Sequence, residues 1–375
     1  MDEKNRQPYR SLFWPLFLIG VGVIWLLSNI GIIESFSFVF LLKLWPLALI
    51  AIGLDLMFGR RSPFLGALIG VGVVALVVAL LLMAPDLDLD TGAELKTLSF
   101  SEALGEATSA RIDLQLSRYP TTIDALEDSN ALIEAELETL EDASFDAHGT
   151  SQKVIKLEPQ GETNFIDWLE ALGSQANWEI ALSPDVPLDL HVDVGSGSAQ
   201  LDLDTLTLER LDLDGGSGST RLSLPTSTER YDVRVDGASG SFSIDVAEAA
   251  ELEVELDVAS GSFSIDIAER VDLAADLKGG SGSLTITIAE NAEVDLSIDG
   301  ASGSTTINVP SAAGVRVVVR DSGSGSVSVP GGYDMVSDGN DDDRDTGTWE
   351  SENYADAEYR IKITFEGGSG SFRVR

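Results

Sequence analysis

The sequence predicts a mixed membrane and all-β protein, in which three N-terminal transmembrane helices precede an extracytoplasmic β-solenoid-like stack with two strands per repeat. Three observations support this fold class. Long apolar segments fill the first 85 residues. A Ser-Gly-Ser phrase, as in DGASGSFSID at residues 236–245, then recurs about every 21 residues. Alternating apolar and polar residues flank each occurrence, which is typical of strands with one buried face.

Three apolar segments are long enough to cross a bilayer, which takes about 20 helical residues. They predict spans at 12–33, 36–58 and 64–84, and so a three-helix transmembrane domain at 1–85. The first segment alone resembles a cleaved signal peptide, but two more spans follow it and no small-x-small cleavage motif ends it. Pro46 lies inside the second span and predicts a kink there.

Basic residues set the orientation of this domain. Lys4, Arg6 and Arg10 precede the first span, and Arg60 and Arg61 lie between the second and third spans. The positive-inside rule then places the N-terminus in the cytoplasm. The sequence thus predicts a multi-pass protein of the cell membrane, with membrane lipid as one partner and residues 86–375 outside the cytoplasm.

The charge of the remaining chain is strongly negative. Of 62 acidic and 24 basic side chains, 58 and 18 follow residue 85. Such a surface repels nucleic acid and attracts cations, cationic peptides and basic proteins. The plain alternative is that the charge serves solubility. The chain has no cysteine, so disulfide and thiolate chemistry are excluded.

The repeated phrase marks a corner between two strands. Each period has one alternating run before the phrase, such as Tyr231–Val235, and one after it, such as Phe242–Val246. Stacking such coils buries the apolar residues as ladders, and eight coils make a stack about 40 Å long. This predicts a repeat domain at 186–375. The central glycines of the corners are Gly197, Gly218, Gly240, Gly261, Gly282, Gly303, Gly325 and Gly370.

Two interpretations of these glycines are possible. Glycine supplies backbone angles that are closed to other residues, and serine hydroxyls hydrogen-bond to a turn, so the phrase fits a structural corner. The alternative is a phosphate-binding loop, which requires a GK[ST] continuation and a following helix. Neither follows any of the corners, so we favour the structural corner.

One position of the repeat is almost always acidic. Coils stacked in register would bring these side chains into one line, with neighbouring carboxylates about 5 Å apart and repelling by roughly 1 kcal/mol in water. Either each carboxylate caps its own turn, which we favour, or divalent cations bind between coils. Asp236, Asp257 and Asp299 are therefore calcium candidates. The full set, four residues before each central glycine, is Asp193, Asp214, Asp236, Asp257, Lys278, Asp299, Asp321 and Glu366.

The segments beside the repeats lack the period. Residues 92–185 predict a β-rich subdomain that caps the first coil, because an exposed solenoid end invites edge pairing. Residues 331–360 predict a loop insertion that folds over the far end. In this loop Asp341, Asp343, Asp345 and Glu352 occupy positions 1, 3, 5 and 12 of an EF-hand loop, although glycine falls at position 7 instead of 6. They are the other calcium candidates, and no further cofactor is expected.

No catalytic constellation is visible. The two histidines are His148, in a polar stretch, and His191, which alternates outward on a predicted strand. HExxH, GxSxG and Cys–His arrangements are lacking, and acidic pairs are too common to indicate a glycosidase. We expect no enzyme and assign no catalytic residue.

Two parts of the chain resemble known families. Trp14-Pro15-Leu16-Phe17-Leu18-Ile19 and Trp45-Pro46-Leu47-Ala48-Leu49-Ile50, with a third span behind them, resemble the LiaI/LiaF-type transmembrane domain. The stretch from NWEIALSPDVPLDL to TRLSLP (177–225) and the closing GTWESENYADAEYRIKITFEGGSGSFRV resemble toastrack β-repeat domains. The resemblance implies a LiaF-like protein of the response to cell-wall-active antibiotics, with a membrane sensor kinase or another envelope protein as partner.

Three functions are compatible with these observations. The first is a non-enzymatic sensor or regulator of cell-envelope stress, which the resemblance favours. The second is a surface scaffold or adhesin that binds wall polymer. The third is a polysaccharide-cleaving enzyme on a β-solenoid, which ranks last because Ser, Thr and Asp dominate the outward positions. The oligomeric state is left open.

Overall fold

The computed structural model describes residues 15, 18–20, 22, 45–54, 57, 63–83, 95–116, 118–127, 130–161, 176–237, 239–258, 260–300, 302–338 and 346–375. The chain divides into two compact units. One contains the N-terminal helices, and the other contains all the strands of the described residues.

The N-terminal unit contains helices α3 (Trp45–Leu54) and α4 (Pro63–Met83). Helix α4 coincides with the third predicted span, and α3 lies inside the second. Pro46 is the second residue of α3, where its missing N–H costs nothing. The predicted kink at Pro46 would also involve residues 35–44, which lie outside the described part. Most of the first predicted span lies outside it too. Among the described residues, no helix is long and apolar enough to cross a membrane.

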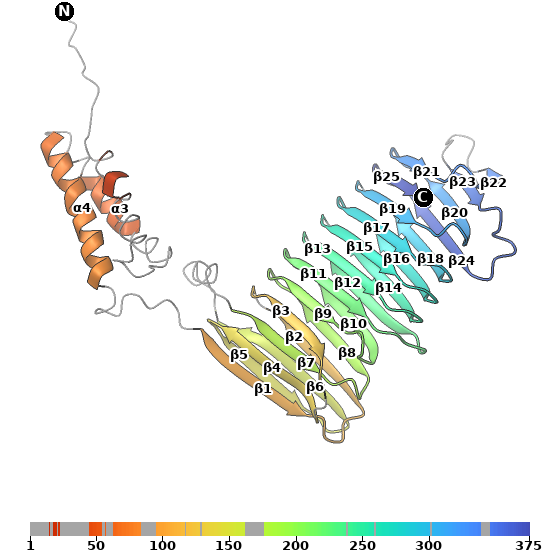
Figure 1. The fold of residues 1–375 in the computed structure, drawn as a ribbon, viewed down its shortest axis with the longest axis horizontal. Coiled ribbons are helices and arrows are strands. Elements are labelled where there is room, and N and C mark those ends of the chain that lie inside the picture. Colours follow the sequence, from red (N-terminus) through yellow and green to blue (C-terminus); the bar gives the residue numbers. More distant parts are fainter. Residues whose placement is uncertain are drawn as a thin grey trace, which may run out of the picture. The chain divides into compact units, whose positions relative to one another are not determined.

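The second unit consists of two sheets (Figure 1). In spatial order, the 12-stranded sheet contains β1 (Lys96–Ala103), β4 (Ala131–Thr139), β7 (Trp178–Leu182), β3 (Thr121–Ala125), β9 (Ala199–Asp202), β11 (Ser219–Leu224), β13 (Ser241–Val246), β15 (Ser262–Ile267), β17 (Ser283–Ile288), β19 (Ser304–Asn308), β25 (Ser371–Val374) and β21 (Ser326–Ser328).

The 13-stranded sheet contains, in spatial order, β22 (Asp334–Asp338), β23 (Gly347–Glu350), β20 (Gly314–Asp321), β24 (Arg360–Glu366), β18 (Glu293–Asp299), β16 (Asp272–Lys278), β14 (Glu251–Val258), β12 (Tyr231–Gly237), β10 (Leu208–Asp214), β8 (Leu188–Asp193), β2 (Ser109–Gln115), β6 (Gln152–Gln160) and β5 (Asp142–His148).

Each repeat forms one coil, with a strand in the 13-stranded sheet followed across a corner by a strand in the 12-stranded sheet. Neighbouring coils pair in parallel and in register, so that Phe242 of β13 lies beside Phe263 of β15. Their rings stack with centroids 4.9 Å apart. Alternate residues are buried, as in Ser-Phe-Ser-Ile-Asp-Val of β13. The predicted β stack is confirmed, and the structure shows that its repeats pair as parallel strands. Its core is the set of apolar ladders between the two sheets.

The central glycines have a different role from the one the sequence suggested. None of those that the structure describes has the positive φ that we expected. The reason for glycine is the close approach of neighbouring corners. A Cβ at Gly218 would overlap the carbonyl oxygen of Gly197, and one at Gly303 would overlap that of Gly282. A side chain at these positions therefore collides with the backbone of the preceding coil.

The coils do not follow one another in sequence order at either end of the stack. Strands β24 and β25, the last in the chain, lie between β18/β19 and β20/β21 (Figure 1). Strands β2 and β3 likewise lie between β6/β7 and β8/β9. The described strands make ten coils instead of the eight predicted.

The outermost strands at both ends are antiparallel. Strand β4 pairs with β7, and β1 with β4, while β5 pairs with β6. At the other end β23 pairs with β20 and β22 with β23. The stretch 92–185 that we assigned to a separate cap thus continues both sheets and contributes two coils, because its alternating runs carry the same buried ladder. The 331–360 insertion adds two edge strands to one sheet.

Candidate functional site: the charged face of the 13-stranded sheet

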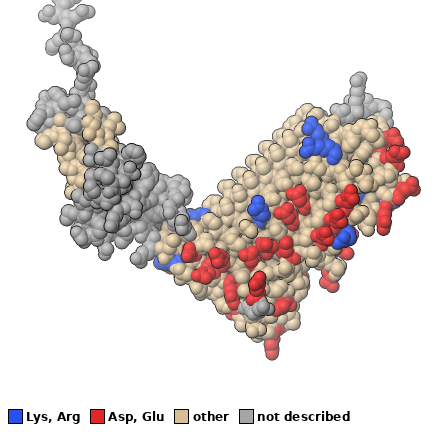
Figure 2. Space-filling model, viewed as in Figure 1, with Lys and Arg blue, Asp and Glu red and all other residues tan. Residues whose placement is uncertain are grey.

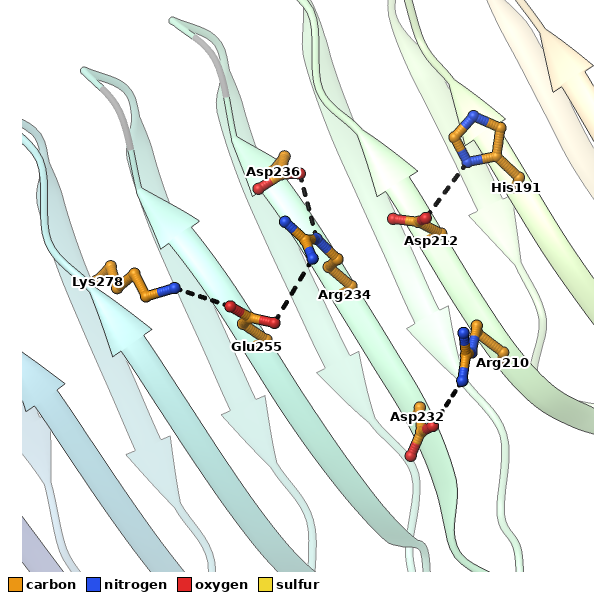
Figure 3. A network of polar contacts seen from close by, with 8 residues as sticks. All are labelled: His191, Arg210, Asp212, Asp232, Arg234, Asp236, Glu255 and Lys278. Atoms are coloured by element: carbon orange, nitrogen blue, oxygen red, sulfur yellow. Dashed lines mark hydrogen bonds and ion pairs between the residues drawn. The ribbon is translucent and has the colours of Figure 1, made fainter.

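The alternation of each strand directs one polar set away from the core. On the 13-stranded sheet this set is rich in charged residues, and we call the outward side chains of β8, β10, β12, β14 and β16 the charged face. Figure 3 shows eight residues of this region, which come from four adjacent strands and from Lys278 at the end of β16. In the view of Figure 2, acidic side chains outnumber basic ones along the described part of the stack.

The predicted acidic column is present on this sheet. The register pairs Asp236 with Asp257, Asp257 with Lys278, and Lys278 with Asp299. Neighbouring strands are about 4.8 Å apart, so these side chains are close neighbours. One correction concerns the order, because Glu366 lies between Asp299 and Asp321.

Turn capping by these carboxylates is seen at two positions. Asp193 accepts the N–H of Gly195 at 3.1 Å, and Asp321 accepts that of Gly323 at 2.7 Å. Both glycines have a positive φ, 63° and 59°. The corresponding donors after Asp236, Asp257 and Asp299 are residues 238, 259 and 301, which lie outside the described residues.

Basic side chains pair with acidic ones both within a strand and across strands (Figure 3). Arg234 lies 3.3 Å from Asp236 and 3.8 Å from Glu255, and Lys278 lies 2.8 Å from Glu255. Hydrogen bonding to Lys278, with its charge and that of Arg234, lowers the pKa of Glu255. Exposed pairs of this kind contribute about 0–1 kcal/mol each to stability. This network therefore determines the distribution of charge on the surface more than it stabilises the fold.

His191 occupies the outward position that the sequence predicted. Its Nδ1 is 3.7 Å from Asp212 and its Nε2 is 3.9 Å from Asp214. Burial raises the pKa of Asp214; the His191 charge opposes this, whereas Asp212, Asp236 and Asp193 add to it.

Amide substitutions at Asp214 and Glu255 should have opposite effects. A raised pKa means that folding favours the protonated Asp214, so its contribution is lost as pH rises above the usual value of 3.8. Asp214→Asn should therefore raise the melting midpoint at pH 7 and leave it unchanged near pH 3. Glu255→Gln should lower the midpoint at pH 7, because a lowered pKa stabilises the fold above the usual 4.5. Thermal unfolding by circular dichroism from pH 3 to 8 measures both, and equal signs would contradict this account.

Metal binding gains no geometric support within the described ranges, where no three His, Asp or Glu side chains converge on a point that could hold an ion. Of the EF-hand-like candidates, Asp341, Asp343 and Asp345 lie outside those ranges, and Glu352 is exposed in a turn. Calcium binding by these residues, or by Asp236, Asp257 and Asp299, stays a prediction.

Calcium can be tested by melting the full-length protein in detergent with EDTA and with millimolar calcium. If the carboxylates serve as turn caps, the two melting midpoints should agree. A bound ion at 100 times its Kd would stabilise the fold by about 2.7 kcal/mol, which shifts the midpoint by several degrees. Such a shift would show that one of the two candidate sets binds calcium.

A second acidic surface was missed by the sequence analysis. Asp124, Glu134, Glu136 and Glu179 line an open groove of about 720 Å³ on the outer face of the 12-stranded sheet. We call these four residues the acidic groove. Burial, with the charges of Asp202 and Glu179, raises the pKa of Asp124. The groove depends on the pairing of β4 with β7 and of β7 with β3, which no local pattern indicates.

The geometry defines a β-repeat protein, in which paired parallel strands form a long stack with charged outer faces. Residues 91–245 match the family described as the N-terminal domain of toast_rack, DUF2154, and residues 12–57 match the LiaI-LiaF-like transmembrane region. The chain therefore joins a LiaI-LiaF-like transmembrane region to a toast-rack domain, and is a membrane-anchored β-repeat protein. No curated protein matches it.

Solved structures with some likeness include three bacterial proteins. A candidate cell adhesion protein from Clostridium sporogenes is 12% identical, with a TM-score of 0.27 and coverage of 74% of this chain and 99% of that one. A candidate adhesin from Bacteroides fragilis is 11% identical, with a TM-score of 0.38 and coverage of 75% and 97%. One from Parabacteroides distasonis is 11% identical, with a TM-score of 0.37 and coverage of 76% and 98%. No function is transferred from these likenesses.

Proposed function

We propose that the protein is a non-enzymatic sensor or regulator of cell-envelope stress, with its N-terminus in the cytoplasm and its β stack outside. The observation that carries the proposal is the union of a LiaI-LiaF-like transmembrane region with a toast-rack domain in one chain. The transmembrane region would contact a sensor kinase or another envelope protein. The β stack would receive the signal.

The charge of the stack supports a cationic signal. Its acidic excess attracts cationic peptides and divalent cations by long-range electrostatics. Both sheets present carboxylates outward, on the charged face and in the acidic groove. Screening by salt weakens such attraction, because the Debye length is only about 8 Å at physiological ionic strength. Binding should therefore weaken as salt is raised.

The test compares host cells that lack the gene with cells that carry the full chain, during exposure to a cationic, cell-wall-active antibiotic. Loss of the chain should change the induction of envelope-stress transcripts at least several-fold. An Asp124→Asn, Glu134→Gln, Glu136→Gln, Glu179→Gln variant should reduce that effect. The matched control changes four exposed carboxylates outside both the acidic groove and the charged face, Glu229→Gln, Asp266→Asn, Glu290→Gln and Glu293→Gln.

Three outcomes distinguish the possibilities. An altered response in cells without the chain supports a sensor or regulator. An unaltered response, together with binding of the full-length protein to isolated wall polymer, would replace this function by that of a surface scaffold. An equal effect of the two four-site variants would show that total charge matters and that the acidic groove has no special role.

A further inference from the structure

At the C-terminal end of the stack, two coils have sequences that fit the position beside β18 and β19. We call β24 and β25 the C-terminal coil, and β20 and β21 the displaced coil. The central glycine of the displaced coil, Gly325, follows Gly303 by 22 residues, the same interval that separates Gly218 from Gly240. Gly218 and Gly240 belong to coils that stack directly. The displaced coil instead lies one coil further along, because the C-terminal coil occupies the place beside β18 and β19.

The two coils match position by position. The register pairs Val315 with Ile361, Val317 with Ile363 and Val319 with Phe365, and all six are 5% exposed or less. Outward positions match as well, because Arg316 pairs with Lys362. Lys362 forms an ion pair with Asp295 of β18 at 2.8 Å, so Arg316 would bring the same charge to that position.

The contacts of the C-terminal coil with β18 and β19 are specific. Besides the Lys362 pair, Arg375 donates to Asn308 at 2.7 Å, and the hydroxyls of Ser371 and Ser304 lie 3.1 Å apart. None of these contacts requires the two partners to share one chain. An identical coil from a second copy would form all of them, which is why exchange of a terminal element is a low-cost route to dimers.

We propose that the C-terminal coil is exchanged between two copies of this chain, each copy inserting residues 360–375 beside β18 and β19 of the other. Two features favour a second copy as the occupant. The charge pattern of the slot matches this chain's own coil, and the displaced coil can close on β18 and β19 while the slot is vacant. A molecule whose C-terminal coil has left therefore does not expose β18 and β19 as unpaired edges of the two sheets.

The connection to the C-terminal coil is long enough for exchange. Residues 351–359 link β23 to β24 and cross the start of β20. Hydrogen bonds hold this link to the start of β20, from Ser351 N to Val315 O at 2.9 Å, from Val315 N to the Ser351 hydroxyl at 2.8 Å and from the Asn353 amide to Ala312 O at 2.8 Å. Exchange requires these bonds to break. Nine residues reach about 30 Å when extended, which allows the coil to enter a neighbouring molecule.

Single cysteines report the exchange, because the chain has none of its own. Asp299→Cys and Glu366→Cys full-length variants, co-expressed in equal amounts, place one thiol in each of two different chains. These two positions are register partners on β18 and β24, within disulfide reach. After mild oxidation in detergent, exchange predicts that about half of the chains run as covalent dimers. A variant that carries both Asp299→Cys and Glu366→Cys in one chain shows whether a disulfide can bridge the two positions.

Two controls make the result decisive. Asp257→Cys co-expressed with Glu366→Cys should give no covalent dimer, because β14 and β24 are not neighbours. An Asp299→Cys, Asp321→Cys variant reports direct closure of the displaced coil. Absence of interchain bridges between Asp299→Cys and Glu366→Cys chains, when the double variant bridges within its own chain, would overturn the proposal. Intrachain closure without interchain bridges would do so as well.

Discussion

Gly282→Ala should destabilise the stack by about 3 kcal/mol or more. A Cβ at this position overlaps the carbonyl oxygen of Gly261 in the preceding coil. Backbone cannot rotate away as a flexible side chain can, so the corner or the strand pairing must shift. The melting midpoint of the full-length protein, followed by the circular dichroism of its strands, measures the effect.

Gly331→Ala is the matched control. Gly331 has no heavy atom within 4 Å of an added Cβ, and its backbone has no positive φ. This substitution should change stability by about 0.5 kcal/mol or less. If both variants melted together with the natural protein, close packing of the corners would not be the reason for the glycine column.

Glu141→Ala should cost about 3–5 kcal/mol, because it removes the carboxylate that forms a nearly buried ion pair with Arg118. Arg118 forms an ion pair with Glu141, and the two side chains are only 14% and 13% exposed. The pair joins the corner between β2 and β3 to the turn between β4 and β5. Thermal unfolding at neutral pH measures the loss.

The neighbouring Asp142 provides the control. It pairs with Lys96 at 2.7 Å, but these side chains are 68% and 51% exposed. Asp142→Ala should therefore cost less than about 1 kcal/mol. A loss at Asp142 as large as that at Glu141 would show that burial does not distinguish the two pairs.

Much of the repeat architecture could be predicted because its signals are local. Alternation identified the strands on either side of each corner, and the glycine spacing identified which residues share a column. Asp236 and Asp257 are register partners as expected, and His191 points outward. These features depend only on period and on the two faces of a strand.

The order of the coils could not be predicted, because the displaced coil and the C-terminal coil carry apolar residues at matching positions and either could pair with β18. Contacts between residues far apart in the sequence decide which coil does so, and no local sequence pattern indicates these contacts. The same holds for the acidic groove, which needs β4 beside β7, and for the pair of Arg118 with Glu141. The predicted role of the central glycines was also wrong in detail. Glycine is required there by close contact with the backbone of the preceding coil, and not by a positive φ of the glycine itself.

The insertion of the C-terminal coil has a consequence for how the stack opens at its end. Linear arrays fray by losing one terminal repeat at a time. Here the outermost coil, β20 and β21, precedes β24 and β25 in sequence, and β24 and β25 lie one layer inside it. The inner layer cannot open until the outer layer has separated from it, so amide protons of β24 and β25 should exchange no faster than those of β20 and β21. A nascent chain also cannot complete this end of the stack until residues 360–375 have been synthesised.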